Sequence, residues 1–305
     1  MIKVRDIAYV RFGAPDLDAA EKFANDFGLV TVLRNEDSLY SRGTDPDPYV
    51  HVVELGEAGF RGVAFEAASA EDLKAISQVE GVSDVEKIEA PGGGVRVALS
   101  DPDGFAVEVV HGRELLPALD VRKPLPLNRG SDRQRLGELQ RVQAGAAQVK
   151  RIGHCVVRVS DFGTSKQWYA SRFGFLTSDE VYLGDPSNVV TAFMRCDRGD
   201  VHVDHHTFLC VGIGEPGFDH VAFEVEDFDS VMLGHDHLKN GGYDHHAGIG
   251  RHVLGSQIFD YWKDPWGNVH EHFSDGDLLN AQAEVGSFDP AVALGTQWGS
   301  FAGGD

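Results

Sequence analysis

The sequence repeats itself, and this duplication constrains the fold more than any other feature of the chain. Three pairs of segments match in the same order. They are residues 7–29 with 152–175, GFRGVAFE at 59–66 with GFDHVAFE at 217–224, and DPDGFAVE at 101–108 with DPWGNVHE at 264–271. The offset between matched residues grows slowly, from 146 at Phe27/Phe173 to 163 at Glu108/Glu271. Collinear matches of this kind indicate a duplicated domain with insertions in the second copy.

Each copy is built of two similar units in turn. In the second copy, the strand and helix at 152–175 precede strands near 189–195 and 207–211, and those at 221–240 precede strands near 257–263 and 269–273. Alternation in VAFEV places Val221, Phe223 and Val225 on one face, which would pack on a helix. We therefore predict an α+β fold of four βαβββ modules paired into two domains.

Proline and glycine mark a linker between the two copies. Within it, Gln134–Val149 could add a helix, although many polar residues disfavour one. After Asp275 the chain becomes rich in glycine and alanine, while Trp298 and Phe301 favour docking of this tail on the body. We predict a first domain at 1–115, a linker at 116–150, a second domain at 151–275, and a tail at 276–305 that could cover an active site.

Charge and composition exclude several classes of function. Lys and Arg number 27 against 48 Asp and Glu, so the formal net charge is −21. Proteins that bind nucleic acid or anionic lipid need a cationic surface, so we expect neither partner. No run of about 20 apolar residues could span a membrane, and the first residues lack the apolar core of a signal peptide. Three cysteines in no metal-binding spacing fit reduced thiols, so we expect a cytoplasmic protein.

Histidine is distributed unevenly, and this asymmetry points to the second copy as the place of chemistry. Twelve of the fourteen histidines lie after residue 150. His154 stands in the first strand of copy two, where copy one has Ala8 or Tyr9. His220 stands where copy one has Gly62. Imidazole is the commonest ligand of transition metals in proteins, so copy two has gained, or copy one has lost, two candidate ligands.

The third candidate ligand is a carboxylate that both copies keep, Glu271 in copy two and Glu108 in copy one. Two imidazoles and one carboxylate on one face of an octahedron hold Fe(II) and leave positions open for substrate and O₂. We therefore predict a metal site of His154, His220 and Glu271. Copy one lacks both imidazoles, so we expect Glu108 to be hydrogen-bonded, salt-bridged or exposed.

Six other histidines of copy two are not assigned to the candidate metal site. Alternation along VHEHF points His270 and His272 away from the candidate ligand between them, so we expect both to face outward. His235 and His237 are expected to be solvated on a helix, and His245 and His246 are expected on a loop surface or at the rim of a substrate pocket.

The whole chain resembles the vicinal oxygen chelate superfamily, and specifically its two-domain type I extradiol ring-cleavage dioxygenases. The segments that carry the resemblance are GFDHVAFE at 217–224, GRHVLG at 250–255 and FDYWKDPWG at 259–267. The resemblance implies two incompletely closed β-barrels, of which the first is non-catalytic and the second binds Fe(II) through His154, His220 and Glu271. Some members use Mn(II) instead. The resemblance is closest to the branch that acts on homoprotocatechuate or trihydroxytoluene-like diols.

The resemblance also implies which residues act in catalysis. The catalytic histidine of the family falls in the His-His-Thr segment at 205–207, where His206 fits best and His205 has no assigned role. A further histidine of the family falls on His252, and a tyrosine falls on Tyr261. The implied reaction opens a catechol ring beside its hydroxyls with O₂. His206 would move a proton as the O–O bond breaks, while His252 and Tyr261 would hydrogen-bond the bound oxygens.

The resemblance also implies partners and leaves two other functions open. The partners are a small aromatic diol and O₂, and we expect a homo-oligomer. A lyase, isomerase or transferase of the same superfamily would use the metal as a Lewis acid without O₂, and such proteins often draw ligands from both copies. A protein that only binds small aromatics would have no reason to keep His206, Tyr261 and His252 around an open metal.

Overall fold

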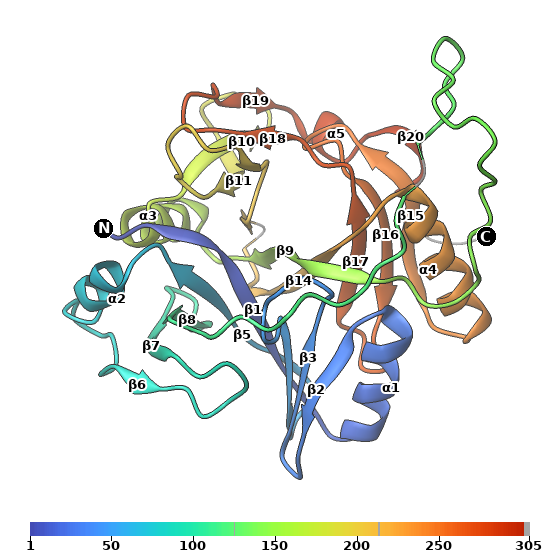
Figure 1. The fold of residues 1–305 in the computed structure, drawn as a ribbon. Coiled ribbons are helices and arrows are strands. Elements are labelled where there is room, and N and C mark those ends of the chain that lie inside the picture. The colour runs from blue at the N-terminus through green and yellow to red at the C-terminus, as the bar shows by residue number, and fades with distance from the viewer. Residues whose placement is uncertain (125, 213, 302–305) are drawn as a thin grey trace.

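The structure of the chain, a computed structural model, describes residues 1–124, 126–212 and 214–301. The predicted α+β fold is confirmed, because strands dominate, the helices are short, and each copy has one large sheet that does not close; β12 of copy two pairs with β18 in a separate two-stranded sheet. The first sheet has eight strands and the second has ten. Figure 1 shows copy one in blue to cyan and copy two in green to red.

Copy one consists of two βαβββ modules. They comprise β1 (Val4–Ala14), α1 (Leu17–Phe27), β2 (Val30–Arg34), β3 (Ser38–Arg42) and β4 (His51–Leu55), then β5 (Gly59–Ala67), α2 (Ala70–Ile76), β6 (Glu86–Lys87), β7 (Val95–Ser100) and β8 (Ala106–His111). In each module the first strand pairs in parallel with the last, β1 with β4 and β5 with β8. The modules join where β1 and β5 pair antiparallel, so the strand order is β2-β3-β4-β1-β5-β8-β7-β6.

Copy two repeats this arrangement. Its elements are β9 (Val149–Arg158), α3 (Phe162–Phe173), β10 (Leu176–Tyr182), β11 (Val189–Arg195), β12 (Val203–Asp204) and β13 (Phe208–Val211), then β14 (Gly217–Val225), α4 (Phe228–Asn240), β15 (His245–His252), β16 (Ile258–Lys263) and β17 (Val269–Ser274). Here β9 pairs in parallel with β13, β14 pairs in parallel with β17, and β9 and β14 join the two modules antiparallel. The four predicted modules are therefore present.

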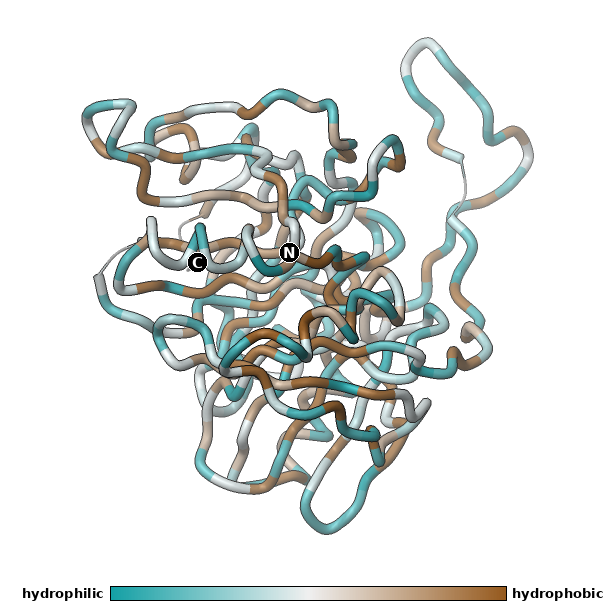
Figure 2. Tube along the Cα trace, turned by 90° about the vertical axis from the view of Figure 1, so that its left-hand side faces the viewer, coloured by the Kyte–Doolittle hydropathy of each residue, from teal (hydrophilic) through white to brown (hydrophobic). Residues whose placement is uncertain are grey.

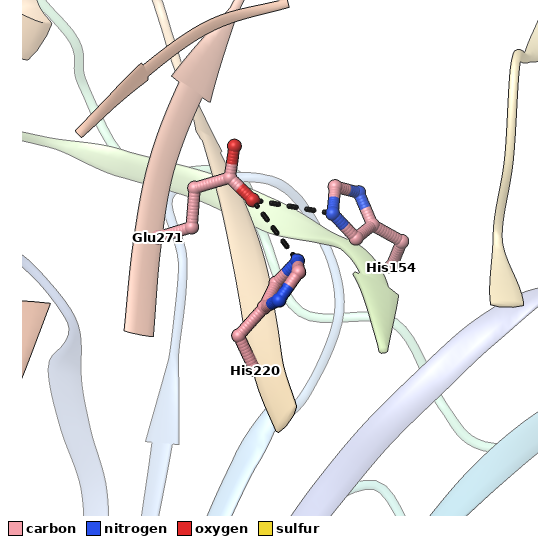
Figure 3. A group of neighbouring side chains, drawn as sticks. All are labelled: His154, His220 and Glu271. Carbon is pink, nitrogen blue, oxygen red and sulfur yellow. Dashed lines mark ion pairs between the residues drawn. The ribbon is translucent and has the colours of Figure 1, made fainter. Parts of the chain in front are cut away.

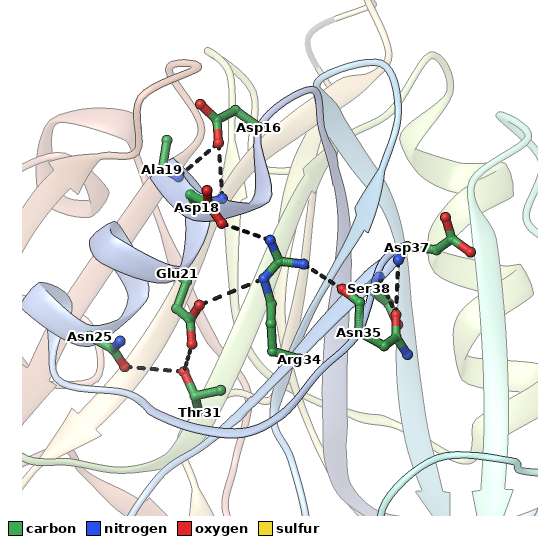
Figure 4. Close-up of polar contacts among 10 residues, drawn as sticks. All are labelled: Asp16, Asp18, Ala19, Glu21, Asn25, Thr31, Arg34, Asn35, Asp37 and Ser38. Atoms are coloured by element: carbon green, nitrogen blue, oxygen red, sulfur yellow. Dashed lines mark hydrogen bonds and ion pairs between the residues drawn. The ribbon is translucent and has the colours of Figure 1, made fainter.

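Helix α1 begins at a polar cap and is tied to the neighbouring strand. The Asp16 carboxylate accepts hydrogen bonds from the backbone N–H groups of Asp18 and Ala19 (Figure 4). Arg34 at the end of β2 pairs with Asp18 and Glu21 on the helix. These contacts fix α1 beside β2, so that its buried aromatic face can pack on the second copy.

The two copies share one hydrophobic core. At the end of α1, the ring of Phe27 stacks on His272 of β17 and contacts Phe223 of β14. At the end of α3, the ring of Phe173 contacts Phe65 of β5. Each copy thus inserts the end of its first helix against the sheet of the other copy, and this exchange fixes how the two sheets are placed.

The expectation that His270 and His272 face outward is wrong. Both point away from the carboxylate between them, as alternation requires, but copy one covers that face of β17 and both are buried. His272 Nε2–H donates a hydrogen bond of 2.6 Å to the Phe27 carbonyl. The Nε2 atoms of His51 and His270 lie 3.2 Å apart. Because His270 Nδ1–H donates to the Asn268 carbonyl, His51 is the donor in this pair.

The segment between the copies is irregular throughout its described residues from 112 to 148, so the helix considered for Gln134–Val149 does not form. In Figure 1 this green segment crosses the body and then loops out before it returns to β9. Figure 2 shows much of the projecting loop in teal, which marks hydrophilic residues. The domain boundaries at 115 and 150 stay predictions.

The tail crosses from one edge of the second sheet to the other. Its elements are β18 (Leu278–Leu279), β19 (Gly286–Phe288), α5 (Pro290–Ala293) and β20 (Thr296–Gly299). Strand β19 pairs with β10, and β20 pairs with β15 at the opposite edge. Residues 302–305 of the predicted tail lie outside the described residues. Within the described ranges, none of the helices combines the length and the apolar character needed to cross a bilayer.

Candidate active site

Three side chains of copy two meet inside its curved sheet: His154 from β9, His220 from β14 and Glu271 from β17 (Figure 3). The Oε2 atom of Glu271 lies 3.2 Å from His154 Nε2 and 3.5 Å from His220 Nε2. Ligand atoms bound to one metal at about 2.1 Å lie roughly 3 to 3.4 Å apart. The structure thus brings the three predicted ligands together at a spacing that suits one metal ion.

Strand register explains this convergence. Ala222 in the middle of β14 lies opposite His154 on β9 and opposite Glu271 on β17. His220 precedes Ala222 by two positions, so both side chains point to the same face of the sheet. His220 lies on β14, and its two neighbouring strands carry His154 (β9) and Glu271 (β17). The three residues therefore face one point although they are distant in sequence.

Copy one keeps the carboxylate of this arrangement and replaces the imidazoles. Ala64 lies opposite Tyr9 and Glu108, so Tyr9, rather than Ala8, is the counterpart of His154. The Tyr9 hydroxyl donates a hydrogen bond to Glu108, and the Arg11 guanidinium pairs with the same carboxylate at 2.8 Å. The expectation that Glu108 has polar partners is confirmed. In copy one, the positive charge beside the carboxylate of Glu108 comes from the side chain of Arg11.

Glu271 is a buried carboxylate with imidazole nitrogens beside it. Its side chain is fully buried, and neither carboxylate oxygen accepts a hydrogen bond from the described residues. Burial raises the pKa of Glu271, but the imidazoles of His154 and His220 outweigh burial and lower it. His220 Nδ1–H donates a hydrogen bond of 2.7 Å to Asp219, which leaves Nε2 available as a ligand. This buried anion, with two imidazole nitrogens beside it, fits a divalent transition metal.

His206 lies next to this group at the end of a chain of three side chains. Its ring centroid is 4.1 Å from that of His154. His205 Nε2 lies 2.7 Å from an oxygen of Asp179, and the Nδ1 atoms of His205 and His206 lie 3.1 Å apart. When Asp179 accepts the proton of His205 Nε2, His206 Nδ1–H donates to His205, and His206 Nε2 keeps its lone pair. Burial, with His154 and His205 nearby, lowers the pKa of His206 well below its ordinary value, so the ring is neutral.

Tyr261 and His252 lie near the other oxygen of Glu271. Tyr261 on β16 is opposite Glu271 in the strand register, and its hydroxyl shares a hydrogen bond of 3.0 Å with His252 Nε2. That nitrogen is 3.9 Å from Glu271 Oε1. Burial lowers the pKa of His252 to about 4, and burial together with the charge of Glu271 raises the pKa of Tyr261 well above its ordinary value. Both groups are therefore uncharged at neutral pH.

A cavity of about 450 Å³ adjoins these groups, and its wall includes His154, His206, His220, His252 and Tyr261. The rest of the wall is largely apolar and includes residues of the tail; among its members are Val181, Leu183, Val190, Phe193, Leu209, Leu254, Pro290, Ala293, Leu294 and Phe301. Apart from the histidines and Tyr261, the only ionisable acid or base among the described lining residues is Asp219. The cavity therefore borders the candidate ligands, and most of its other lining residues are apolar.

Two assignments from the sequence were incomplete. His246 lines the cavity, which matches its placement at a pocket rim, but His245 on the same strand points to the other face and contacts Asp260. His235 was expected to be solvated and instead lies against the same carboxylate. Asp260 was not singled out, although a carboxylate in the middle of an apolar strand such as FDYW is a signal that could have identified it.

Known proteins resemble this chain in sequence and in fold. Residues 151–271 match the family model described as the Glyoxalase/Bleomycin resistance protein/Dioxygenase superfamily. A metapyrocatechase 2 from Cupriavidus necator is 30% identical over 97% of this chain and 89% of that protein. An iron-dependent extradiol dioxygenase from Rhodococcus jostii is 25% identical over 98% and 97%. A Mn(II)-bound glyoxalase from Novosphingobium aromaticivorans has a TM-score of 0.78 at 24% identity and covers 98% of this chain and 91% of its own.

Proposed function

This chain belongs to the extradiol dioxygenases of the glyoxalase/bleomycin resistance protein/dioxygenase superfamily, and from that premise we propose that it cleaves catechols whose substituent is uncharged and apolar. Its reaction opens the ring of an aromatic diol with O₂. The observation that carries the proposal is the meeting of His154, His220 and Glu271 beside a largely apolar cavity.

We assign the metal to His154, His220 and Glu271, and we propose Fe(II) as the resident ion. Two imidazoles and a carboxylate suit both Fe(II) and Mn(II). The iron-dependent relative from Rhodococcus jostii, which aligns over nearly the whole chain, favours iron. Bound Fe(II) would supply open coordination positions for the diol oxygens and O₂ and a one-electron route between them.

The residues around the ligands then have distinct tasks. His206 accepts a proton at Nε2 as the diol binds and returns it when the O–O bond breaks. Asp179 and His205 hold the His206 ring in the tautomer and orientation that this transfer needs. Tyr261 and His252 form hydrogen bonds to the substrate oxygens and stabilise the negative charge that develops there. The apolar wall orients the ring and excludes water.

The substituent follows from the apolar part of the cavity wall. A diol with a carboxylate, such as homoprotocatechuate, would bury that charge where no described lysine or arginine lines the wall. Burial of an unpaired carboxylate costs several kcal/mol, on the order of 3 or more. An alkyl or aryl group gains about 25 cal/mol for each Å² of apolar surface that it buries. We therefore infer an alkyl- or aryl-substituted catechol rather than homoprotocatechuate, which is one of the two kinds of diol that the sequence resemblance favours.

A panel of diols tests this proposal. The enzyme is loaded with Fe(II) without O₂, mixed with alkylcatechol, arylcatechol or 3,4-dihydroxyphenylacetate, and exposed to O₂ while the absorbance of the yellow product is recorded. We expect kcat/KM to be at least tenfold higher for the apolar diols, equivalent to about 1.4 kcal/mol. Leu294→Arg, which adds a cation at an exposed position of the cavity wall, should reduce this preference. Equal kcat/KM values for acidic and apolar diols would contradict the assignment of the substituent.

A further inference from the structure

We propose that the chain holds a second transition-metal site, formed by His235, His245 and Asp260, behind the wall of the active site. Asp260 Oδ1 lies 2.8 Å from His245 Nε2 and 3.3 Å from His235 Nδ1. These separations resemble those of the catalytic group, in which a carboxylate oxygen lies 3.2 and 3.5 Å from two imidazole nitrogens. In both groups the ligand atoms all lie within 4.8 Å of one another. The second site does not depend on the proposed dioxygenase reaction.

The position of this cluster is set by three elements. His235 comes from α4, His245 from the start of β15 and Asp260 from β16. Neighbouring side chains of a strand point to opposite faces. Asp260 therefore faces α4, whereas Tyr261 faces the cavity, and His245 and His246 divide in the same way. A metal in this cluster would connect α4 to the two strands that carry His252 and Tyr261.

The charge of Asp260 favours a cation at this position. The side chain is fully buried, and within the described chain its ion-pair partners are the imidazoles of His235 and His245. Trp262 Nε1–H donates a 2.5 Å hydrogen bond to Oδ2, His245 Nε2 lies beside Oδ1, and His235 Nδ1 lies 3.2 Å from Oδ2 and 3.3 Å from Oδ1. A divalent ion would neutralise this buried charge and use the lone pairs of both rings.

Copy one shows that the fold itself does not require this cluster. Ala98 lies opposite Glu108 just as Tyr261 lies opposite Glu271, so the residue matched to Asp260 is Val97. Val97 is fully buried and belongs to the hydrophobic core. The same strand thus packs on its helix through an aliphatic side chain. A buried carboxylate with two histidines needs a different cause, and ligation of a metal supplies one.

The ligand set defines the class of metal. Imidazole with one carboxylate suits zinc, nickel, copper or cobalt, whereas calcium and magnesium prefer oxygen ligands throughout. The side chains of His235 and His245 are 15% and 23% exposed, so an ion can reach the cluster from solvent. Three protein ligands leave one tetrahedral position for water, as in other zinc sites with an open position.

Metal binding to the full chain tests the second site. His220→Ala removes one ligand of the catalytic group, and the folded variant is dialysed against Zn(II) and its metal content is measured. We expect one equivalent of zinc per chain, visible absorption bands of four-coordinate Co(II) when cobalt replaces zinc, and a higher thermal midpoint with either ion. Adding His235→Gln to His220→Ala should abolish all three signals.

A matched control is available on the same helix. His237 lies two positions from His235, contacts Asp26 rather than Asp260, and should leave metal binding unchanged when replaced as His237→Gln. Circular dichroism reports whether each variant is folded. If the His235→Gln variant does not fold, His245→Gln serves as a second probe of the cluster. The proposal fails if folded His220→Ala binds no stoichiometric zinc, or if it binds the same amount after His235→Gln.

Discussion

The Tyr9 hydroxyl donates a hydrogen bond of 2.5 Å to Glu108, at the position where copy two sets His154 against Glu271. Burial and the neighbouring Glu108 charge raise the pKa of Tyr9 well above its ordinary value, so the phenol stays protonated and remains a donor. Arg11 adds a positive charge on the same carboxylate. Copy one thus neutralises its buried carboxylate with its own side chains, whereas copy two sets two imidazoles beside a carboxylate that we propose as a metal ligand.

This relationship predicts different outcomes at two matched positions. Glu271→Gln should abolish iron binding and ring cleavage, because an amide does not supply the anionic ligand. Glu108→Gln should keep both, because its partners Tyr9 and Arg11 belong to a site without imidazoles. Iron content and turnover measured on both purified variants check this. Equal losses at the two positions would mean that both copies contribute to one site, and would favour a lyase or isomerase.

The proton-transfer role of His206 predicts a loss of rate without a loss of metal. His206→Asn should retain iron and bind the diol, but turnover should fall by about 10²–10⁴-fold, the range typical of general acid–base catalysis. Iron content, diol binding without O₂ and stopped-flow turnover separate these steps. His202→Asn, at an exposed position in the same segment, is the control and should have no effect. Unchanged turnover at saturating O₂ would move the role to His205 or His252.

Removal of the catalytic metal should lower stability as well as activity. A metal that binds only the folded state stabilises it in proportion to the logarithm of its concentration over Kd, by about 2.7 kcal/mol at 100 times Kd. Chelation should therefore abolish turnover and lower the thermal midpoint, and Fe(II) added without O₂ should restore both. His235→Gln is the background for this experiment, because it separates the catalytic metal from the second cluster. A thermal midpoint that does not change when chelator or Fe(II) is added would contradict metal binding by His154, His220 and Glu271.

The buried pair at the domain interface predicts how stability depends on pH. Burial and the neighbouring His270 lower the pKa of His51 well below its ordinary value of 6.5. The unfolded chain therefore binds more protons as pH falls below about 6.5, so the stability that neutral His51 contributes is present above that pH and lost below it. Urea unfolding of wild type should show a steeper loss between pH 6.5 and about 5.5 than His51→Gln, by at most about 1.4 kcal/mol per pH unit. Parallel curves for the two proteins would mean that His51 does not titrate on unfolding.

The duplication explains why the candidate ligands could be found without a structure. Tyr9 and His154 occupy one register position, and Gly62 and His220 occupy another. Residues that both copies share are those that the fold requires. Residues found in only one copy, such as His154 and His220, are therefore candidates for function. The same comparison placed Glu108 among polar partners, which are now seen as Tyr9 and Arg11.

The sequence predictions for His272 and His235 failed because segments distant in sequence determine what these side chains contact. Alternation correctly pointed His272 away from Glu271, but the group that covers it, the Phe27 carbonyl, is 245 positions away in the sequence. The prediction that His235 lies on a helix is correct. A histidine on a helix can, however, either face solvent or contact a buried carboxylate, and the sequence of the helix does not distinguish the two. Only the pairing of β15 with β16 brings His245 and Asp260 together beneath that helix.

The path of the tail also bears on how copies of this chain can associate. An unpaired sheet edge can add a strand from another molecule, and short edge strands limit this. The second sheet ends in the three residues of β19 and the four of β20, both supplied by the tail. The first sheet ends in the two residues of β6 and the five of β2, where Val30 and Leu33 are 41% and 38% exposed. A subunit contact formed by extension of a sheet would therefore run along β2, on the copy whose buried carboxylate, Glu108, pairs with Tyr9 and Arg11.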